Sequence, residues 1–116
     1  ERITATLSPS EIQVTPTQAH NLALIINELV TNALRHGLCD RPAANLHVNI
    51  TSEDGMVHLK FGDDGPGFPE DVLHWRRYNV GMGLVRNLMQ RTLNGQVFLS
   101  NDSGAVVTLV FRDEVS

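Results

Sequence analysis

The feature that most constrains this chain is a long helix signal with a clear start and a clear end. Thr15 suits the N-cap, Pro16 suits the first helical position, and Gln18 completes a Thr-x-x-Gln capping box. Gly37 tolerates the left-handed conformation that commonly follows a helix end. Between these ends, apolar side chains recur at helical spacing: Leu22, Ile26, Leu29 and Ala33. We therefore expect one long helix whose apolar stripe packs against a sheet.

A second, polar stripe runs along the same helix. Residues three, four or seven apart share a helix face, and this spacing groups Asn21, Glu28, Asn32 and Arg35. Glu28 and Asn32 have apolar neighbours, so we expect them to be only partly solvated and to need polar partners, because unpaired burial is costly. A bound metal–polyphosphate would supply such partners. A polar edge on a half-exposed helix is the alternative.

Composition limits the class of protein. The chain has 116 residues, 41% of them hydrophobic, which suits one compact domain over residues 1–116 and leaves no room for a second. A net charge of −4, with Lys60 as the single lysine, argues against a non-specific nucleic-acid surface. No apolar run in this sequence reaches membrane-spanning length and no signal peptide is visible in it, and the single cysteine, Cys39, suits a reducing cytosol. The first residue is Glu1, so we expect the chain to be a piece of a longer protein.

Alternation of apolar and polar residues predicts the first strands. Residues 2–7 alternate with period two, and residues 11–14 suit a second, short strand. Residues 38–44 are expected to form a loop. Residues 46–50 and 57–61 alternate again on either side of an Asp-Gly turn, which predicts an antiparallel hairpin with one buried face.

The second half of the chain predicts a loop, a helix and a second hairpin. We expect a tight loop over 62–69, followed by a little-patterned stretch over 69–80 with room for one helical turn. A helix should then run from Gly81 to the Asn94-Gly95 pair. A strand near 97–99, a turn at 101–104 and a strand over 105–111 would complete the chain. The apolar face of this second helix is expected to be Leu84, Val85, Leu88, Met89 and Leu93. The expected fold is α+β, a two-layer sandwich of one mixed, mainly antiparallel sheet covered on one face by helices.

Three features suggest chemistry, and each has an ordinary structural alternative. Asp63-x-Gly65-x-Gly67 places a carboxylate at a strand end, followed by glycines that let the backbone approach a ligand; an acidic turn is the alternative. Gly81-x-Gly83 at a helix start lets anionic groups approach free N–H donors; a flexible helix start is the alternative. The third feature is the acid–amide pair of the first helix.

The order and spacing of these features resemble the GHKL ATPase superfamily, whose members share the Bergerat fold. Residues 27–37 (Asn-Glu-Leu-Val-Thr-Asn-Ala-Leu-Arg-His-Gly) resemble the N box of sensor histidine kinases. Residues 63–68 (Asp-Asp-Gly-Pro-Gly-Phe) are similar to their G1 box, and residues 81–85 (Gly-Met-Gly-Leu-Val) to their G2 box. The resemblance covers nearly the whole chain and implies the catalytic, ATP-binding domain of such a kinase.

The resemblance also implies roles for single residues. Asp63 would accept a hydrogen bond from the adenine amine, and Asn32 would ligate Mg²⁺ through its amide oxygen. Glu28 would be the catalytic residue, either activating water or acting on an acceptor imidazole. The remaining nucleotide-binding residues would be Arg35 at phosphate, His36 at phosphate or ribose, Gly65 and Gly67 around the base, and Gly81, Gly83 and Leu84 at the phosphates.

The segment between the two glycine boxes, residues 69–80, would be the lid over ATP. Arg76 and Arg77 in this segment are available to counter phosphate charge. Some superfamily members carry a threonine after the glycine that starts the last strand, whereas Ala105 follows Gly104 here. No role in adenine binding is therefore expected for Ala105 or for Thr108.

The expected activity is transfer of the ATP γ-phosphoryl group to a histidine. The resemblance implies ATP and Mg²⁺ as ligands, a dimerisation and phospho-acceptor domain of the same protein and a response regulator as partners, and a cytoplasmic location without nucleic-acid or membrane contact. A protein serine kinase of the anti-sigma-factor type is one alternative, since it uses the same boxes. A non-catalytic interaction module that has kept the fold is the other.

Overall fold

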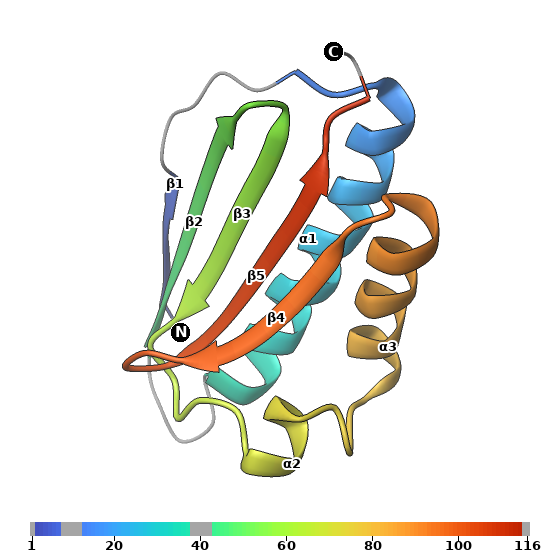
Figure 1. The fold of residues 1–116 in the computed structure, drawn as a ribbon. Coiled ribbons are helices and arrows are strands. Elements are labelled where there is room, and N and C mark those ends of the chain that lie inside the picture. The colour runs from blue at the N-terminus through green and yellow to red at the C-terminus, as the bar shows by residue number, and fades with distance from the viewer. Residues whose placement is uncertain (1, 8–12, 38–42, 115–116) are drawn as a thin grey trace.

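The backbone forms a five-stranded sheet with helices on one of its faces. The computed structural model describes residues 2–7, 13–37 and 43–114, and the side chains of 13–35 and 45–114. The strands are β1 (Arg2–Leu7), β2 (Ala43–Glu53), β3 (Met56–Asp63), β4 (Gln96–Asn101) and β5 (Ala105–Arg112). Their order in the sheet is β1-β2-β3-β5-β4, with β1 parallel to β2 and the other neighbours antiparallel. The mixed, mainly antiparallel sheet that the sequence predicts is confirmed (Figure 1).

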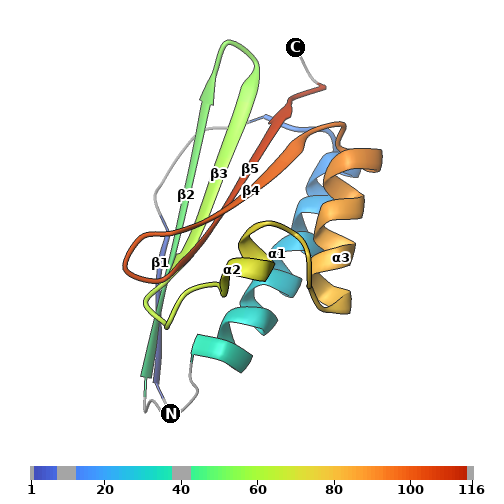
Figure 2. The same ribbon diagram turned by 60° about the horizontal axis from the view of Figure 1, so that its bottom comes forward.

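The helices make the second layer. They are α1 (Pro16–Gly37), the single turn α2 (Glu70–Leu73), and α3 (Val80–Asn87), which continues into a π-helical turn, η1 (Leu88–Thr92). Figure 2 shows α1 and α3 together on one side of the sheet, and Figure 1 shows α2 beyond the end of the sheet where β3 finishes. The α+β two-layer sandwich is therefore the observed architecture. Among the helices of the described residues, none has the length and apolarity needed to cross a membrane.

The start of α1 has the expected capping box. The Thr15 N–H donates to Gln18 Oε1 (3.2 Å), and the Gln18 N–H donates to Thr15 Oγ1 (3.1 Å). Gln18 is only 1% exposed, and it also donates to the Arg112 carbonyl (3.0 Å) and accepts from the Glu114 N–H (3.2 Å). The cap therefore joins the start of α1 to the end of β5.

The core lies between α1, α3–η1 and the inner face of the sheet. Its α1 members are Leu22, Ile25, Leu29 and Ala33. Ile25 is fully buried, whereas Ile26, which the sequence analysis placed on this stripe, is only half-buried. Leu84 was expected on the apolar face of the second helix, but it is 37% exposed, and Met82 takes the buried position. The reason is rotation: α3 begins at Val80, and its buried side is set by Met82, Val85 and Met89.

Several boundaries differ from the sequence-based expectation. Ala43 and Ala44 belong to β2, so the expected loop over 38–44 ends earlier, and residues 38–42 lie outside the described part. Of the expected short strand over 11–14, residues 13 and 14 are not in a strand, and residues 11 and 12 lie outside the described part. The single helical turn expected within residues 69–80 is α2.

The two hairpins follow their turn residues. In the β2–β3 turn, Asp54 and Gly55 have φ values of 53° and 79°, as a type I′ turn requires. At the end of η1, Asn94 takes the left-handed conformation (φ 52°), and the Gly95 N–H donates to the Met89 carbonyl (2.7 Å). The Asn-Gly pair therefore ends the helix as expected.

Replacing Gln18 with alanine tests the link between α1 and β5. Gln18→Ala removes the side-chain half of the capping box, so the Thr15 N–H loses its acceptor, while the backbone N–H of residue 18 can still donate to Thr15 Oγ1. It also leaves the Glu114 N–H and the Arg112 carbonyl without this partner, so we expect the free energy of unfolding to fall by about 2 kcal/mol. Urea denaturation measures the change. Gln96→Ala, at an exposed glutamine of β4, is the control and should change stability by less than about 0.5 kcal/mol. Equal effects of the two changes would contradict the link.

Candidate functional site

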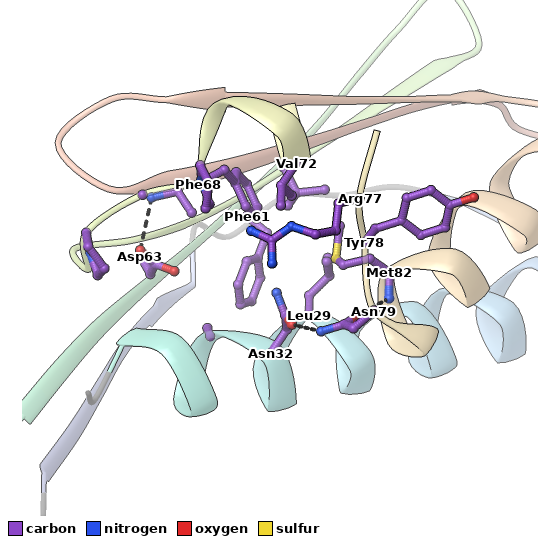
Figure 3. A pocket seen from close by; sticks show the side chains of 16 residues that line it. Leu29, Asn32, Phe61, Asp63, Phe68, Val72, Arg77, Tyr78, Asn79 and Met82 are labelled. Carbon is purple, nitrogen blue, oxygen red and sulfur yellow. Dashed lines mark hydrogen bonds between the residues drawn. The ribbon is translucent and has the colours of Figure 1, made fainter. Parts of the chain in front are cut away.

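A cavity of about 550 Å³ lies between α1, the end of β3 and the residues 66–79 (Figure 3). Its apolar walls are Leu29, Ala33, Phe61, Pro66, Phe68, Pro69, Val72, Met82, Ala105 and Val107. Its polar side chains are Asn32, Asp63, Arg77, Tyr78 and Asn79. Predominantly apolar walls with a few polar groups are typical of a small-molecule site.

Asp63 ends β3 and is held by two backbone amides. Its Oδ1 accepts from the Gly65 N–H (2.9 Å) and from the Ala105 N–H (3.0 Å). Both donors meet the same oxygen, which fixes the plane of the carboxylate. Ala105 thus takes part in the site through its backbone, a contact that the sequence analysis did not expect.

The glycine loop after Asp63 is held by Asn101 from the end of β4. The Phe68 N–H donates to Asn101 Oδ1 (2.7 Å), and Asn101 Nδ2 donates to the Phe68 carbonyl (3.0 Å). Gly67 has φ +88°, and a Cβ there would lie 2.8 Å from Asn101 Oδ1. Glycine is therefore required here by both the backbone conformation and the space. Sequence reasoning missed Asn101 because a polar residue before a turn has no distinguishing pattern.

Asn32 and Asn79 form a hydrogen-bonded pair between α1 and the start of α3. Asn79 Nδ2 donates to Asn32 Oδ1 (2.7 Å), and Asn79 Oδ1 accepts from the Met82 N–H (2.8 Å) as the N-cap of α3 (Figure 3). The sequence analysis placed the helix start at Gly81 and missed Asn79. Asparagine is a common N-cap residue, so Asn79 could have been recognised from the sequence. The helix start was instead placed at the glycine box two residues later.

A second cavity, of about 360 Å³, adjoins this pair. It is lined by Glu28, Thr31, Asn32, Arg35, Asn79, Val80, Gly81 and Leu84. Asn32 and Asn79 line both cavities and therefore lie where the two meet. The Glu28 carboxylate lies against the start of α3: a Cβ built on Gly81 would be 2.6 Å from Glu28 Oε2.

Most of the expected site residues meet in these two cavities. Asp63, Gly67 and Asn32 line the first, and Glu28, Asn32, Arg35, Gly81 and Leu84 line the second. Two others adjoin them: Gly65 bonds Asp63, and a Cβ on Gly83 would lie 3.3 Å from the Tyr78 ring. Asn21, which the sequence analysis placed on the same polar stripe, lines neither cavity. It is buried and donates to the Thr17 carbonyl within α1 (3.0 Å). The side chain of His36 lies outside the described part of the chain.

Residues 69–80, the expected lid, contain an ion pair between Arg77 and Asp71 and an aromatic ring that contacts α3. Arg77 Nε donates to Asp71 Oδ2 (2.7 Å), and this hydrogen bond lowers the pKa of Asp71 and raises that of Arg77. Arg77 also lines the first cavity, whereas Arg76 is exposed and lines neither cavity. Arg86 of α3 lies 4.9 Å from the centre of the Trp75 ring, a cation–π contact that joins the lid segment to α3.

The donor set of the site suits a cation bound together with a substrate. Among the described side chains, no group of three or more His, Cys, Asp or Glu residues could hold a metal ion by itself. Magnesium is instead commonly bound by one or two hard protein oxygens together with substrate phosphates and water. The amide oxygen of Asn32, at the junction of the cavities, is a hard oxygen of this kind.

Comparison with known proteins agrees with this geometry. Residues 17–115 match the family model described as histidine kinase-, DNA gyrase B- and HSP90-like ATPase. The anti-sigma F factor of Geobacillus stearothermophilus is 30% identical over 69 residues, which are 60% of this chain and 47% of that protein. The blue-light-activated histidine kinase 2 of Erythrobacter litoralis is 33% identical over 73 residues, which are 62% of this chain and 21% of the kinase.

A solved structure shares the fold over nearly the whole chain. The histidine kinase domain of the Erythrobacter litoralis EL346 blue-light activated histidine kinase has a TM-score of 0.81 and 26% identity, covering 95% of this chain and 51% of that chain. The matched parts make up about half, or less, of each of these three proteins. The family resemblance drawn from the three sequence boxes is confirmed: the chain belongs to the family of histidine kinase-, DNA gyrase B- and HSP90-like ATPases.

Proposed function

We propose that this chain is the ATP-binding catalytic domain of a sensor histidine kinase. It would transfer the γ-phosphoryl group of ATP to a histidine on the dimerisation domain of the same protein, from which a response regulator would receive it in the cytoplasm. The observation that carries the proposal is that Asp63 and Asn32 line one cavity, while Asn32 and Glu28 line the cavity that adjoins it. A single nucleotide can therefore reach all three side chains.

The base would bind in the first cavity. Asp63 Oδ1 is already bonded to two backbone amides, so we assign Oδ2 to the 6-amino group of adenine. A hydrogen bond to a charged group contributes about 1.5–3 kcal/mol. The apolar walls, including Phe61 and Val107, would cover the faces of the ring. Gly65 and Gly67 let the loop lie close to the base.

The phosphates would lie near the junction of the cavities and over the start of α3. Asn32 Oδ1 would hold Mg²⁺, which would neutralise phosphate charge when bound. Gly81, Gly83 and the amide of Leu84 would receive phosphate oxygens at the helix N-terminus. Arg35 and His36 would add contacts from α1.

Glu28 is the residue we assign to catalysis. Its carboxylate lies against Gly81, where the γ-phosphate would end. It would orient the acceptor imidazole or remove its proton. Phosphoryl transfer depends chiefly on positioning and charge neutralisation, so loss of this group would slow transfer rather than abolish it.

A second function is favoured by a specific observation. Several of the similar curated proteins are anti-sigma F factors. A protein serine kinase of the anti-sigma-factor type would use the same base and metal contacts with a serine acceptor. The two functions differ in the chemistry of the phosphorylated product.

Asp63→Asn tests the adenine contact. The asparagine oxygen can keep both backbone bonds, but Nδ2 would then face the 6-amino group, donor against donor, so we expect ATP to bind roughly 10- to 100-fold more weakly. Preference for ATP over GTP should also narrow, because Nδ2 can donate to a 6-oxo group. Calorimetric titration measures both nucleotides.

Two controls accompany this change. Asp102→Asn, at an exposed carboxylate of the β4–β5 turn, should leave ATP affinity unchanged, and Arg76→Ala should weaken it far less than Asp63→Asn. An equal loss for Asp63→Asn and Arg76→Ala would mean that adenine lies elsewhere. Absence of ATP binding by the unmodified domain would favour a non-catalytic interaction module.

Gly81→Ala tests the position of Glu28. The added Cβ would force the Glu28 carboxylate to move, since the two would be 2.6 Å apart. The helix itself should gain stability, because alanine is a better helix former by about 1 kcal/mol. We expect phosphoryl transfer in the longer protein to slow roughly 10- to 100-fold. Adding Gly81→Ala to Glu28→Gln should cause little further loss, and fully additive losses would contradict this placement.

The phosphorylated product separates the two kinase types. The longer protein incubated with γ-labelled ATP should gain label that is lost in acid and kept in alkali, as a phosphohistidine requires. Residues 1–116 alone should gain none, because the acceptor would lie on another domain. Acid-stable label on a serine of a partner would instead establish the anti-sigma-factor type, and acid-labile label on residues 1–116 alone would contradict the proposed arrangement.

A further inference from the structure

Asn79 has a chain of hydrogen bonds whose direction is set by a backbone amide. The Met82 N–H can only donate, so the atom of Asn79 that faces it, at 2.8 Å, must be Oδ1. The Asn79 side chain therefore has only its NH₂ group, Nδ2, to offer to Asn32. The Asn79 carbonyl accepts from the Gly83 N–H (3.0 Å), which holds the same residue at the start of α3.

This chain of bonds determines which end of the Asn32 amide faces α3. The NH₂ of Asn79 donates to Asn32 Oδ1 at 2.7 Å, so the oxygen of Asn32, rather than its nitrogen, is turned toward Asn79 and the start of α3. The two ends of an asparagine amide have nearly the same shape, so packing alone does not choose between them. A carbonyl oxygen has two lone pairs and can accept from Asn79 while it ligates a cation.

We propose that Asn79 is a positioning residue that orients the Asn32 amide so that its oxygen faces the divalent cation of the bound nucleotide. The inference rests on the proposed nucleotide-binding function and goes beyond it, because Asn79 lies outside all three sequence boxes. Both amides line both cavities, which places the pair where base and phosphate sites meet. Removing a residue that is hydrogen-bonded to a metal ligand commonly weakens metal binding 10- to 100-fold.

Two substitutions separate the orienting role from helix capping. Asn79→Ser keeps a neutral oxygen that can cap α3 but is too short to donate to Asn32, whereas Asn79→Ala loses both functions. We expect only Asn79→Ala to lower the unfolding midpoint clearly. Asn87→Ser, at an exposed position of α3, is the matched control and should change neither property.

The measurement is the ATP dissociation constant in EDTA divided by the one in excess magnesium, both obtained by calorimetry. The unmodified domain should bind ATP more tightly with magnesium, and this ratio should fall roughly 10-fold in both Asn79→Ser and Asn79→Ala. Asn32→Ala should abolish the magnesium effect, and Asn79→Ser added to Asn32→Ala should cause no further change in the ratio.

The outcomes distinguish this inference from the proposed function. In one outcome, Asn32→Ala abolishes the magnesium effect, but Asn79→Ser keeps the full ratio or weakens ATP binding equally with and without magnesium. The orienting role is then wrong and the proposed site stands. If the unmodified domain binds no ATP, or binds it without any magnesium effect, the metal site fails and the orienting role fails with it.

Discussion

The carboxylate of Asp63 is the point on which the arrangement of the site depends. Its Oδ1 accepts N–H groups from Gly65 in the glycine loop and from Ala105 at the start of β5. One atom therefore links three segments: the end of β3, the loop and the last strand, which already pairs with β3 along the sheet. Asn101 adds a second link by holding Phe68 on both backbone groups. The loop is thus fastened to the sheet at two points, and the first cavity lies beneath it.

The long helix α1 contributes lining residues to both cavities. Its buried stripe, Leu22 to Ala33, packs on the sheet, and its partly exposed edge presents Glu28 and Asn32. Because Asn32 belongs to the lining of both cavities, a base bound beside Asp63 and a phosphate near Glu28 can belong to the same ligand. The proposed function depends on this adjacency of the two cavities more than on any single residue.

Much of the fold could be predicted, because its signals are local. The capping box of Thr15 and Gln18, the Asp54-Gly55 turn and the Asn94-Gly95 helix end each depend on residues within a few positions of one another. Leu84 was placed wrongly for a different reason. Helical periodicity identifies candidates for a buried face, but the rotation of a short helix is decided by what it packs against, and Met82 took that place in the core.

Most of the helices and strands, their order and the three boxes that indicate the family could be read from the sequence, although no strand is found at residues 13 and 14. The pairing of the site atoms depends on the tertiary structure. Asn79 lies 47 residues from Asn32, Ala105 lies 42 from Asp63, and Asn101 lies 33 from Phe68. Hydrogen bonds over such separations form when packing of the helices on the sheet brings the segments together. No local pattern in the chain encodes which oxygen accepts or which amide donates.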